Sequence, residues 1–110
     1  MKRTLMSLAA ASVMFAGHAA ALKPGDAAAG KDKAQACMAC HGPEVNNPTF
    51  PKIAGQHADY LYQALRAYKN GDRQNAVMSG QAAGLSQQDM ADLATYFSTL
   101  DSGLESISRN

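Results

Sequence analysis

The chain has 110 residues, with ten Lys and Arg against nine Asp and Glu, no Trp and two Cys. This length and charge balance allow one domain and exclude a polycation of the kind that binds nucleic acid. At the N-terminus, Lys2 and Arg3 precede a short apolar run, residues 4–16, and the small residues 19–21. A membrane span needs about 20 apolar residues, so this pattern predicts a cleaved secretory signal over residues 1–21.

The predicted signal places the mature chain, residues 22–110, in the periplasm with no membrane anchor after cleavage. The mature chain keeps all nine acidic residues and eight of the ten basic ones, a formal net charge of −1. It has few large apolar side chains, and a domain this small often needs a covalent staple or a cofactor.

The mature chain reads as all-helical, with no convincing strand pattern. Three stretches have helical periodicity or composition together with end signals, and they are residues 27–37, 58–69 and 87–100. Asp26 is the predicted N-cap of the first helix, Ser86 opens a capping box at the third, and Asn70-Gly71 ends the second. Residues 42–56 and 70–85 are predicted to be loops, and loops this long are usually functional or wrap around something.

The residues with the most specific chemistry are Cys37 and Cys40, which stand in the stretch CMACHG with His41 directly after them. A disulfide here would close a tiny ring and constrain little of the unfolded chain. A thioredoxin-like redox pair would need a βαβ context, and a zinc site would need further ligands at finger spacing. In C-x-x-C-H, the two thiols add to the vinyl groups of a haem and the histidine ligates its iron. The motif favours one covalently attached haem c.

A haem iron held by one histidine needs a sixth ligand from the opposite wall, or a reason for its absence. Met38 lies inside the attachment turn, and Met90 fits the apolar stripe of the third helix. Met78 lies in the predicted loop RQNAVMSGQAAG on no apolar periodicity, and a thioether suits haem iron. His57 is the other candidate, although a surface or helix-start histidine is its simpler interpretation. We predict Met78 as the ligand opposite His41.

An iron-ligating histidine usually donates its other ring N–H to a carbonyl or carboxylate. The stretch TFPKIAG offers a rigid candidate, because Pro51 fixes its own φ and restrains Phe50. An ordinary turn proline is an equally good interpretation of the same residues.

Four stretches resemble a class I c-type cytochrome in their order and spacing: CMACHG, TFPKIAGQHADYLYQAL, GDRQNAVM and LSQQDMADLATYFSTL. The resemblance covers residues 25–100 and is closest to the small bacterial periplasmic monohaem type, similar to cytochrome c-553 and to one half of a dihaem cytochrome c4. It implies an all-α cytochrome c fold, with three main helices and loops wrapped around one covalent haem. Residues 22–100 would form this domain and residues 101–110 a loose tail.

The same resemblance assigns the residues around the haem. It implies that Cys37 and Cys40 are the thioether donors and that His41 and Met78 are the axial ligands. The family's proline, whose carbonyl accepts from the proximal histidine, matches Pro51.

Three further positions are implied less specifically by the resemblance. Ile53 matches an aliphatic residue that packs on the haem. Arg73 either neutralises a haem propionate or is a solvated loop charge. The first and last helices would cross near Gly30 and Tyr96-Phe97, with Ala34 where larger members carry an aromatic residue, so this contact is expected to be weaker.

An iron with two strong axial ligands has no open position, so cycling between Fe(II) and Fe(III) is its available chemistry. We therefore expect an electron carrier and not an enzyme, a monomer that passes single electrons between transient redox partner proteins. The alternatives are a tightly bound electron-transfer subunit of a periplasmic dehydrogenase or oxidase complex, and a haem sensor or enzyme whose iron binds a small molecule.

Overall fold

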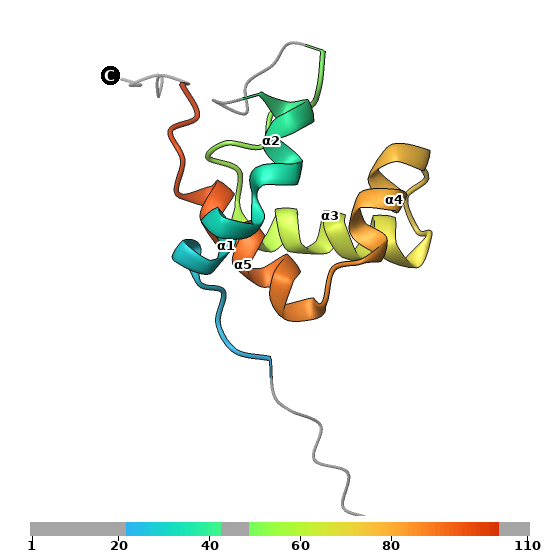
Figure 1. The fold of residues 1–110 in the computed structure, drawn as a ribbon, viewed down its shortest axis with the longest axis horizontal. Coiled ribbons are helices and arrows are strands. Elements are labelled where there is room, and N and C mark those ends of the chain that lie inside the picture. Colours follow the sequence, from blue (N-terminus) through green and yellow to red (C-terminus); the bar gives the residue numbers. More distant parts are fainter. Residues whose placement is uncertain (1–21, 43–48, 104–110) are drawn as a thin grey trace, which may run out of the picture.

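The computed structural model describes residues 22–42 and 49–103, and this part of the chain is all-helical (Figure 1). Its helices are α1 (Ala27–Lys33), α2 (Gln35–His41), α3 (Ala58–Asn70), α4 (Ala76–Ala83) and α5 (Gln87–Ser98). None of the helices in these ranges has the length and apolar character needed to cross a membrane. The predicted signal peptide and residues 104–110 of the predicted tail lie outside the described residues.

The predicted first helix is two helices in the structure, and the second of them runs four residues further than expected. The break falls at Ala34, whose N–H bonds to the carbonyl of Lys31, three residues back. Such a bond tightens the last turn of a helix. Nothing in CMACH stops a helix, so α2 continues until Gly42, which takes a positive φ of 78°.

The predicted loop over residues 70–85 is wrong in its second half, which forms α4. Asn75 begins this helix by accepting a hydrogen bond from the Met78 N–H, at 3.0 Å. The sequence AVMSGQAA is rich in Ala, which favours a helix, but its apolar residues do not recur at helical spacing. The periodicity that identified the other helices is therefore missing here. Met78 therefore lies on a helix and not in a loop.

The other two predicted helices are confirmed, with small shifts at their ends. Gly71 ends α3 in the left-handed conformation, with a φ of 84°. The capping box is present at α5, where the Ser86 side chain bonds to the Asp89 N–H and Asp89 returns a bond to the Ser86 N–H. Helix α5 ends at Ser98, two residues before the predicted end.

Helix α5 is the centre of the fold, because α1 and α3 both pack against it. Its apolar stripe is buried, with Met90 and Leu93 at 1% exposed and Phe97 at 4%. Helix α4 packs on α3, and in Figure 1 α2 and α4 lie on the same side of α3, near opposite ends. The core itself is small, as the composition predicted; besides Met90 and Ala82, it contains one cluster of buried residues, Ala34, Ala54, Leu61, Leu93, Ala94 and Phe97.

The terminal helices α1 and α5 cross at the predicted place. A Cβ atom on Gly30 would lie 2.1 Å from the carbonyl oxygen of Asp92 and 2.7 Å from the Cβ of Tyr96. The segment before α1 approaches α5 just as closely, since a Cβ on Gly25 would lie 2.1 Å from Thr95 Oγ1. Glycine at both positions lets the backbones come together.

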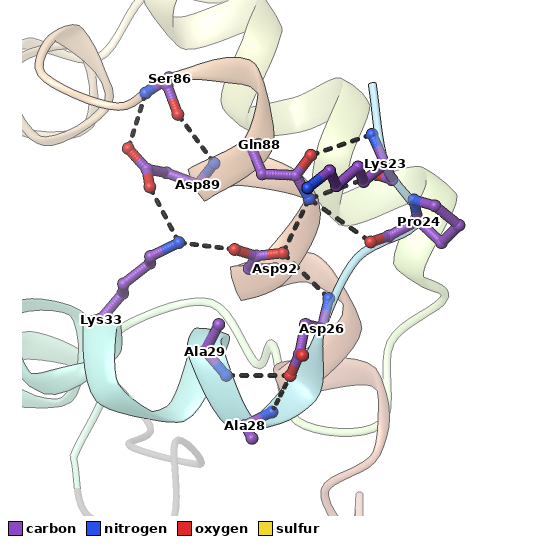
Figure 2. A network of polar contacts seen from close by, with 10 residues as sticks. All are labelled: Lys23, Pro24, Asp26, Ala28, Ala29, Lys33, Ser86, Gln88, Asp89 and Asp92. Atoms are coloured by element: carbon purple, nitrogen blue, oxygen red, sulfur yellow. Dashed lines mark hydrogen bonds and ion pairs between the residues drawn. The ribbon is translucent and has the colours of Figure 1, made fainter. Parts of the chain in front are cut away.

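A polar network that the sequence did not suggest reinforces this crossing (Figure 2). At its centre is Asp92 on α5, which is only 3% exposed. Its Oδ2 accepts from Lys33 Nζ on α1 at 2.5 Å, and its Oδ1 accepts from the Asp26 N–H at 2.9 Å and from Gln88 Nε2 at 3.0 Å. Lys33 also pairs with Asp89 at 3.0 Å. These bonds hold α1 and α5 together. They do so in a protein that has Ala34 in place of the aromatic residue that larger family members carry in the first helix.

The network makes a pH-dependent contribution to stability. Lys33, and after it the Asp26 N–H and Gln88, lower the pKa of the Asp92 carboxyl from its ordinary value of 3.8 to about 2. A depressed carboxyl pKa stabilises the folded state at every pH above the unfolded value. That contribution disappears as the pH falls from about 4 towards 2.

We expect Asp92→Asn to lower the free energy of unfolding by about 1 to 2 kcal/mol at pH 7. The difference from the wild type should shrink as the pH falls towards 2, because protonation then removes the same charge from the wild type. Denaturant unfolding followed by circular dichroism at pH 7, 4 and 2.5 measures this. Asp72→Asn, at an exposed position after α3, is the control and should change stability by less than about 0.5 kcal/mol at each pH. A deficit of equal size at every pH would contradict the assignment.

Candidate haem site

Helix α2 brings the three residues of the C-x-x-C-H motif into its last turns. Cys37 and Cys40 are three residues apart, so their side chains lie on one face of the helix. Both are half-buried free thiols, not joined in a disulfide. The structure thus presents two thiols on the same side, directly before a histidine that ends the helix.

His41 is buried, at 9% exposed, and its ring is oriented by the loop that leads to α3. Its Nδ1 lies 3.0 Å from the carbonyl oxygen of Pro51, and the ring of Phe50 lies beside it with the ring centroids 5.8 Å apart. A carbonyl oxygen can only accept, so Nδ1 must carry the proton and donate it. In the neutral ring with this tautomer, the other ring nitrogen, Nε2, has the lone pair that binds a metal ion.

The environment of the thiols argues against a thiol–disulfide exchange site. Burial is the main cause that raises the pKa of the Cys37 thiol, and the neighbouring Cys40 raises it a little further. A raised pKa keeps the thiol protonated at neutral pH, whereas redox-active cysteines have a depressed pKa. Cys37 is therefore poorly suited to thiol–disulfide exchange.

Met78 lies on a different helix from His41, since Met78 is on α4 and His41 is on α2. Among the described helices, α2 contacts only α1 and α4 contacts only α3. Met78 is half-buried on α4, and its neighbour Val77 is 60% exposed. A ligand pair drawn from α2 and α4 would reach an iron from two separate elements on one side of α3 (Figure 1).

The other candidate ligands occupy the places that the sequence suggested. Met90 is buried in the stripe of α5, at 1% exposed, and Met38 packs from α2 against the core. His57 is exposed at the N-cap position of α3, without a capping bond from its side chain. Met38 and Met90 therefore have a simpler structural role than iron ligation, and His57 is an exposed residue at the start of a helix.

The structure also shows the surroundings of Ile53 and Arg73, two residues whose roles the resemblance implied less specifically. Ile53 is half-buried and packs against the core. The guanidinium of Arg73 lies over the ring of Tyr68, 4.8 Å from its centroid, and the Arg73 N–H donates to the carbonyl of Ala67. These contacts anchor Arg73 to the end of α3, so a propionate would have to compete with the Tyr68 ring for its side chain.

A surface groove with a volume of about 490 Å³ lies elsewhere on the described residues. The segment 22–25, the first turns of α3 and the middle of α5 line it, and neither the C-x-x-C-H residues nor Met78 take part. Within the described ranges, no three His, Cys, Asp or Glu side chains gather as they would around a directly bound metal ion. The chemistry of the chain is therefore assigned to the motif on α2 and not to this groove.

The family model for cytochrome c matches residues 27–101, which include the whole motif, the Pro51 loop and all five helices. The chain belongs to the cytochrome c family. Its cofactor is haem c, bound covalently, and its function is electron transfer. The two thiols and the Nε2 lone pair of His41 are the donor set that this group requires, so the residues present fit the cofactor.

This chain is similar to short cytochromes that it covers almost completely and to longer ones that it covers only in part. Cytochrome c-554(548) of Halomonas halodenitrificans is 45% identical over 80 residues, which are 68% of this chain and 96% of the relative. Cytochrome c4 of Pseudomonas aeruginosa is 48% identical over 77 residues, 68% of this chain but only 38% of the relative.

Among solved structures, reduced recombinant cytochrome c4 from Pseudomonas stutzeri is 31% identical, with a TM-score of 0.60. The match covers 74% of this chain and 53% of that one. These similarities confirm the all-α cytochrome c fold. They also show that this chain spans about half of the length of the cytochromes c4 that it matches, or less.

Proposed function

We propose that this cytochrome is a periplasmic carrier of single electrons with one haem c. Cys37 and Cys40 form the two thioethers in this proposal, and His41 and Met78 are the axial ligands. The observation that carries it is the hydrogen bond from His41 Nδ1 to the Pro51 carbonyl, which leaves Nε2 as the metal-binding atom. When bound, haem c supplies an iron that gains or loses one electron without a change in its covalent attachment.

The residues of the chain set the conditions for that exchange. The Pro51 carbonyl holds the imidazole in one orientation and increases its basicity, which favours the oxidised state. The thioether of Met78 is a weaker donor than a second imidazole, so this ligand pair raises the reduction potential relative to two histidines. Neither ligand side chain needs to gain or lose a proton, so the site can change its charge state with little rearrangement.

The surface near the two ligands is suited to brief encounters with redox proteins. Phe50, beside His41, is 39% exposed, and Val77, next to Met78, is 60% exposed. Both are large apolar side chains in a protein of almost balanced charge. We propose that partners dock here through apolar contacts over a small area, as is usual for electron-transfer complexes. Binding of this kind would respond only weakly to salt.

A visible absorption spectrum of the mature protein, oxidised and reduced, with and without carbon monoxide, tests the proposal. We expect sharp low-spin bands, a weak far-red sulfur-to-iron band in the oxidised state, and no change on adding the gas. A spectral shift with carbon monoxide would instead show an open or labile iron position, and a sensor or enzyme would replace the carrier. Gel filtration in high salt addresses the remaining alternative, because a monomer is expected and a stable second chain would indicate a subunit of a larger complex.

A further inference from the structure

In the described part of the loop between α2 and α3, residues 49–57, two hydrogen bonds connect the His41 ring to the end of α5. In the first, the Pro51 carbonyl accepts from His41 Nδ1, at 3.0 Å. In the second, the Gly55 N–H donates to the carbonyl of Phe97, at 2.9 Å. Only three residues separate Pro51 from Gly55, so the position of one end of this short loop restricts the other.

Two of the three residues between the attachments, Ile53 and Ala54, are packed and resist displacement, while Lys52 is exposed. Ala54 is 3% exposed, and Ile53 packs against the core. The Gln56 N–H bonds back to the carbonyl of Ile53, at 3.3 Å, which closes a turn over Gly55. Pro51 itself has a fixed φ. A shift at Gly55 would therefore be transmitted to the Pro51 carbonyl.

Gly55 lies between the loop and the segment that follows α5. Its φ is +69°, a conformation that favours glycine. A Cβ atom at this position would lie 2.7 Å from the Cβ of Ser102, 3.0 Å from the carbonyl oxygen of Leu100 and 3.1 Å from the Ser102 N–H nitrogen. The chain after α5 thus lies close against one side of Gly55, although Gly55 remains exposed on another side, and an added methyl group would have to displace Ser102.

We propose that Gly55 is a positioning residue for the proximal ligand: its fit between Phe97 and the segment 100–102 holds the Pro51 carbonyl, and through it the His41 ring, in place. This proposal rests on the proposed role of His41 as an iron ligand. The hydrogen bond of Gly55 is to Phe97, and the atoms nearest to a Cβ there belong to Leu100 and Ser102. Gly55 acts by fixing the acceptor on which the ring orientation depends, so the end of α5 becomes part of the support of the haem site.

The variant that tests the proposal is Gly55→Ala in the holoprotein, with Gly71→Ala as its matched control. Both glycines have a positive φ, but a Cβ on Gly71, with φ +84°, would meet nothing within 4 Å. Both variants therefore carry the backbone strain of Ala, and only Gly55→Ala also displaces a neighbouring segment. Any effect that exceeds the control comes from the packing of Gly55.

Two readouts report on the His41 hydrogen bond and would not move with global stability alone. The first is the solvent exchange rate of the hyperfine-shifted His41 Nδ1 proton in the oxidised protein, measured by NMR. We expect it to rise about tenfold or more in Gly55→Ala and to stay near the wild-type value in Gly71→Ala. The second is the reduction potential, which should rise in Gly55→Ala, because a weaker bond to Pro51 makes the imidazole a poorer donor to Fe(III).

A second substitution, at Ser102, separates the displacement of the neighbouring segment from the backbone strain that alanine causes at position 55. Ser102→Gly removes the atom nearest to the new methyl group, so Gly55→Ala combined with Ser102→Gly should recover part of the wild-type exchange rate and potential. Ser102→Gly alone gives the baseline for that comparison. If Gly55→Ala and Gly71→Ala change both readouts equally, or if the double variant recovers nothing, the proposal is wrong.

A measurement on the wild type keeps the test decisive if Gly55→Ala fails to fold. In native-state hydrogen exchange, the Gly55 N–H and the His41 Nδ1 proton should become exposed in the same opening, with equal sensitivity to low denaturant. Rapid exchange of Gly55 beside a protected Nδ1 proton would overturn the proposal. Failure of the proposed function would look different, since the wild type itself would then bind carbon monoxide or lack a hyperfine-shifted Nδ1 proton.

Discussion

Replacing Met78 with alanine is expected to leave the haem attached and to open the iron to carbon monoxide. The two thioethers and His41 do not depend on Met78, which lies on a separate helix. An Ala methyl group cannot ligate iron, so a small molecule can take the vacated position. The reduced variant should show a large spectral shift on adding carbon monoxide, the oxidised variant should lose the far-red sulfur-to-iron band, and the reduction potential should fall.

Met90→Ala is the matched control, because it removes a thioether that the structure assigns to the core. Met90 is 1% exposed on α5, so its truncation should lower the free energy of unfolding by about 2 to 5 kcal/mol. The low-spin spectrum should remain, with no response to carbon monoxide. If Met90→Ala opened the iron and Met78→Ala did not, the ligand assignment would be reversed.

Gly30→Ala is expected to be strongly destabilising. The added methyl group would lie 2.1 Å from the carbonyl oxygen of Asp92 and 2.6 Å from its carbonyl carbon, so α1 and α5 would have to move apart. The contact is with backbone, which cannot rotate away as a side chain can. The same movement would lengthen the bond from Lys33 to Asp92. We expect a loss of about 3 kcal/mol or more, at the upper end of the cost of overpacking.

Gly80→Ala provides a control with the opposite sign. Gly80 lies within α4, and a Cβ there would meet nothing within 4 Å. Alanine stabilises an exposed helix interior relative to glycine by about 0.5 to 1 kcal/mol. Guanidinium unfolding of the holoproteins, followed by far-ultraviolet circular dichroism, measures both changes. Similar free energies for the two variants would show that the close approach of α1 and α5 does not limit stability.

Local sequence signals predicted the helix ends well where a side chain or glycine acts on its own neighbours. Asp26 accepts from the N–H groups of Ala28 and Ala29, as its N-cap position predicted. The capping box at Ser86 and the left-handed Gly71 were equally readable. In each case, the interaction spans at most four residues, so the sequence contains both partners within one short window.

The errors arose where local signals were weak or absent. Helix α4 lacks an amphipathic period and is positioned by its packing on α3, so it read as a loop. The turn at Ala34 depends on a single backbone hydrogen bond to the carbonyl of Lys31. No side chain in the sequence indicates that this bond forms. No local pattern singles out Asp92 on α5. Its partner Lys33 stands 59 positions away, and only the crossing of α1 and α5 brings the two together.

The sequence by itself determined the family, the covalent cofactor and the electron-transfer function, because C-x-x-C-H and the stretches around it are contiguous chemical patterns. It also pointed to Pro51 as a partner of His41, and the structure places its carbonyl 3.0 Å from Nδ1. Only the tertiary structure decided what surrounds that pair. The buried carboxylate of Asp92, the close approach at Gly30 and the fit of Gly55 against Ser102 all join segments far apart in the chain. Such contacts depend on how close two backbones come, and that distance is set only when the helices pack.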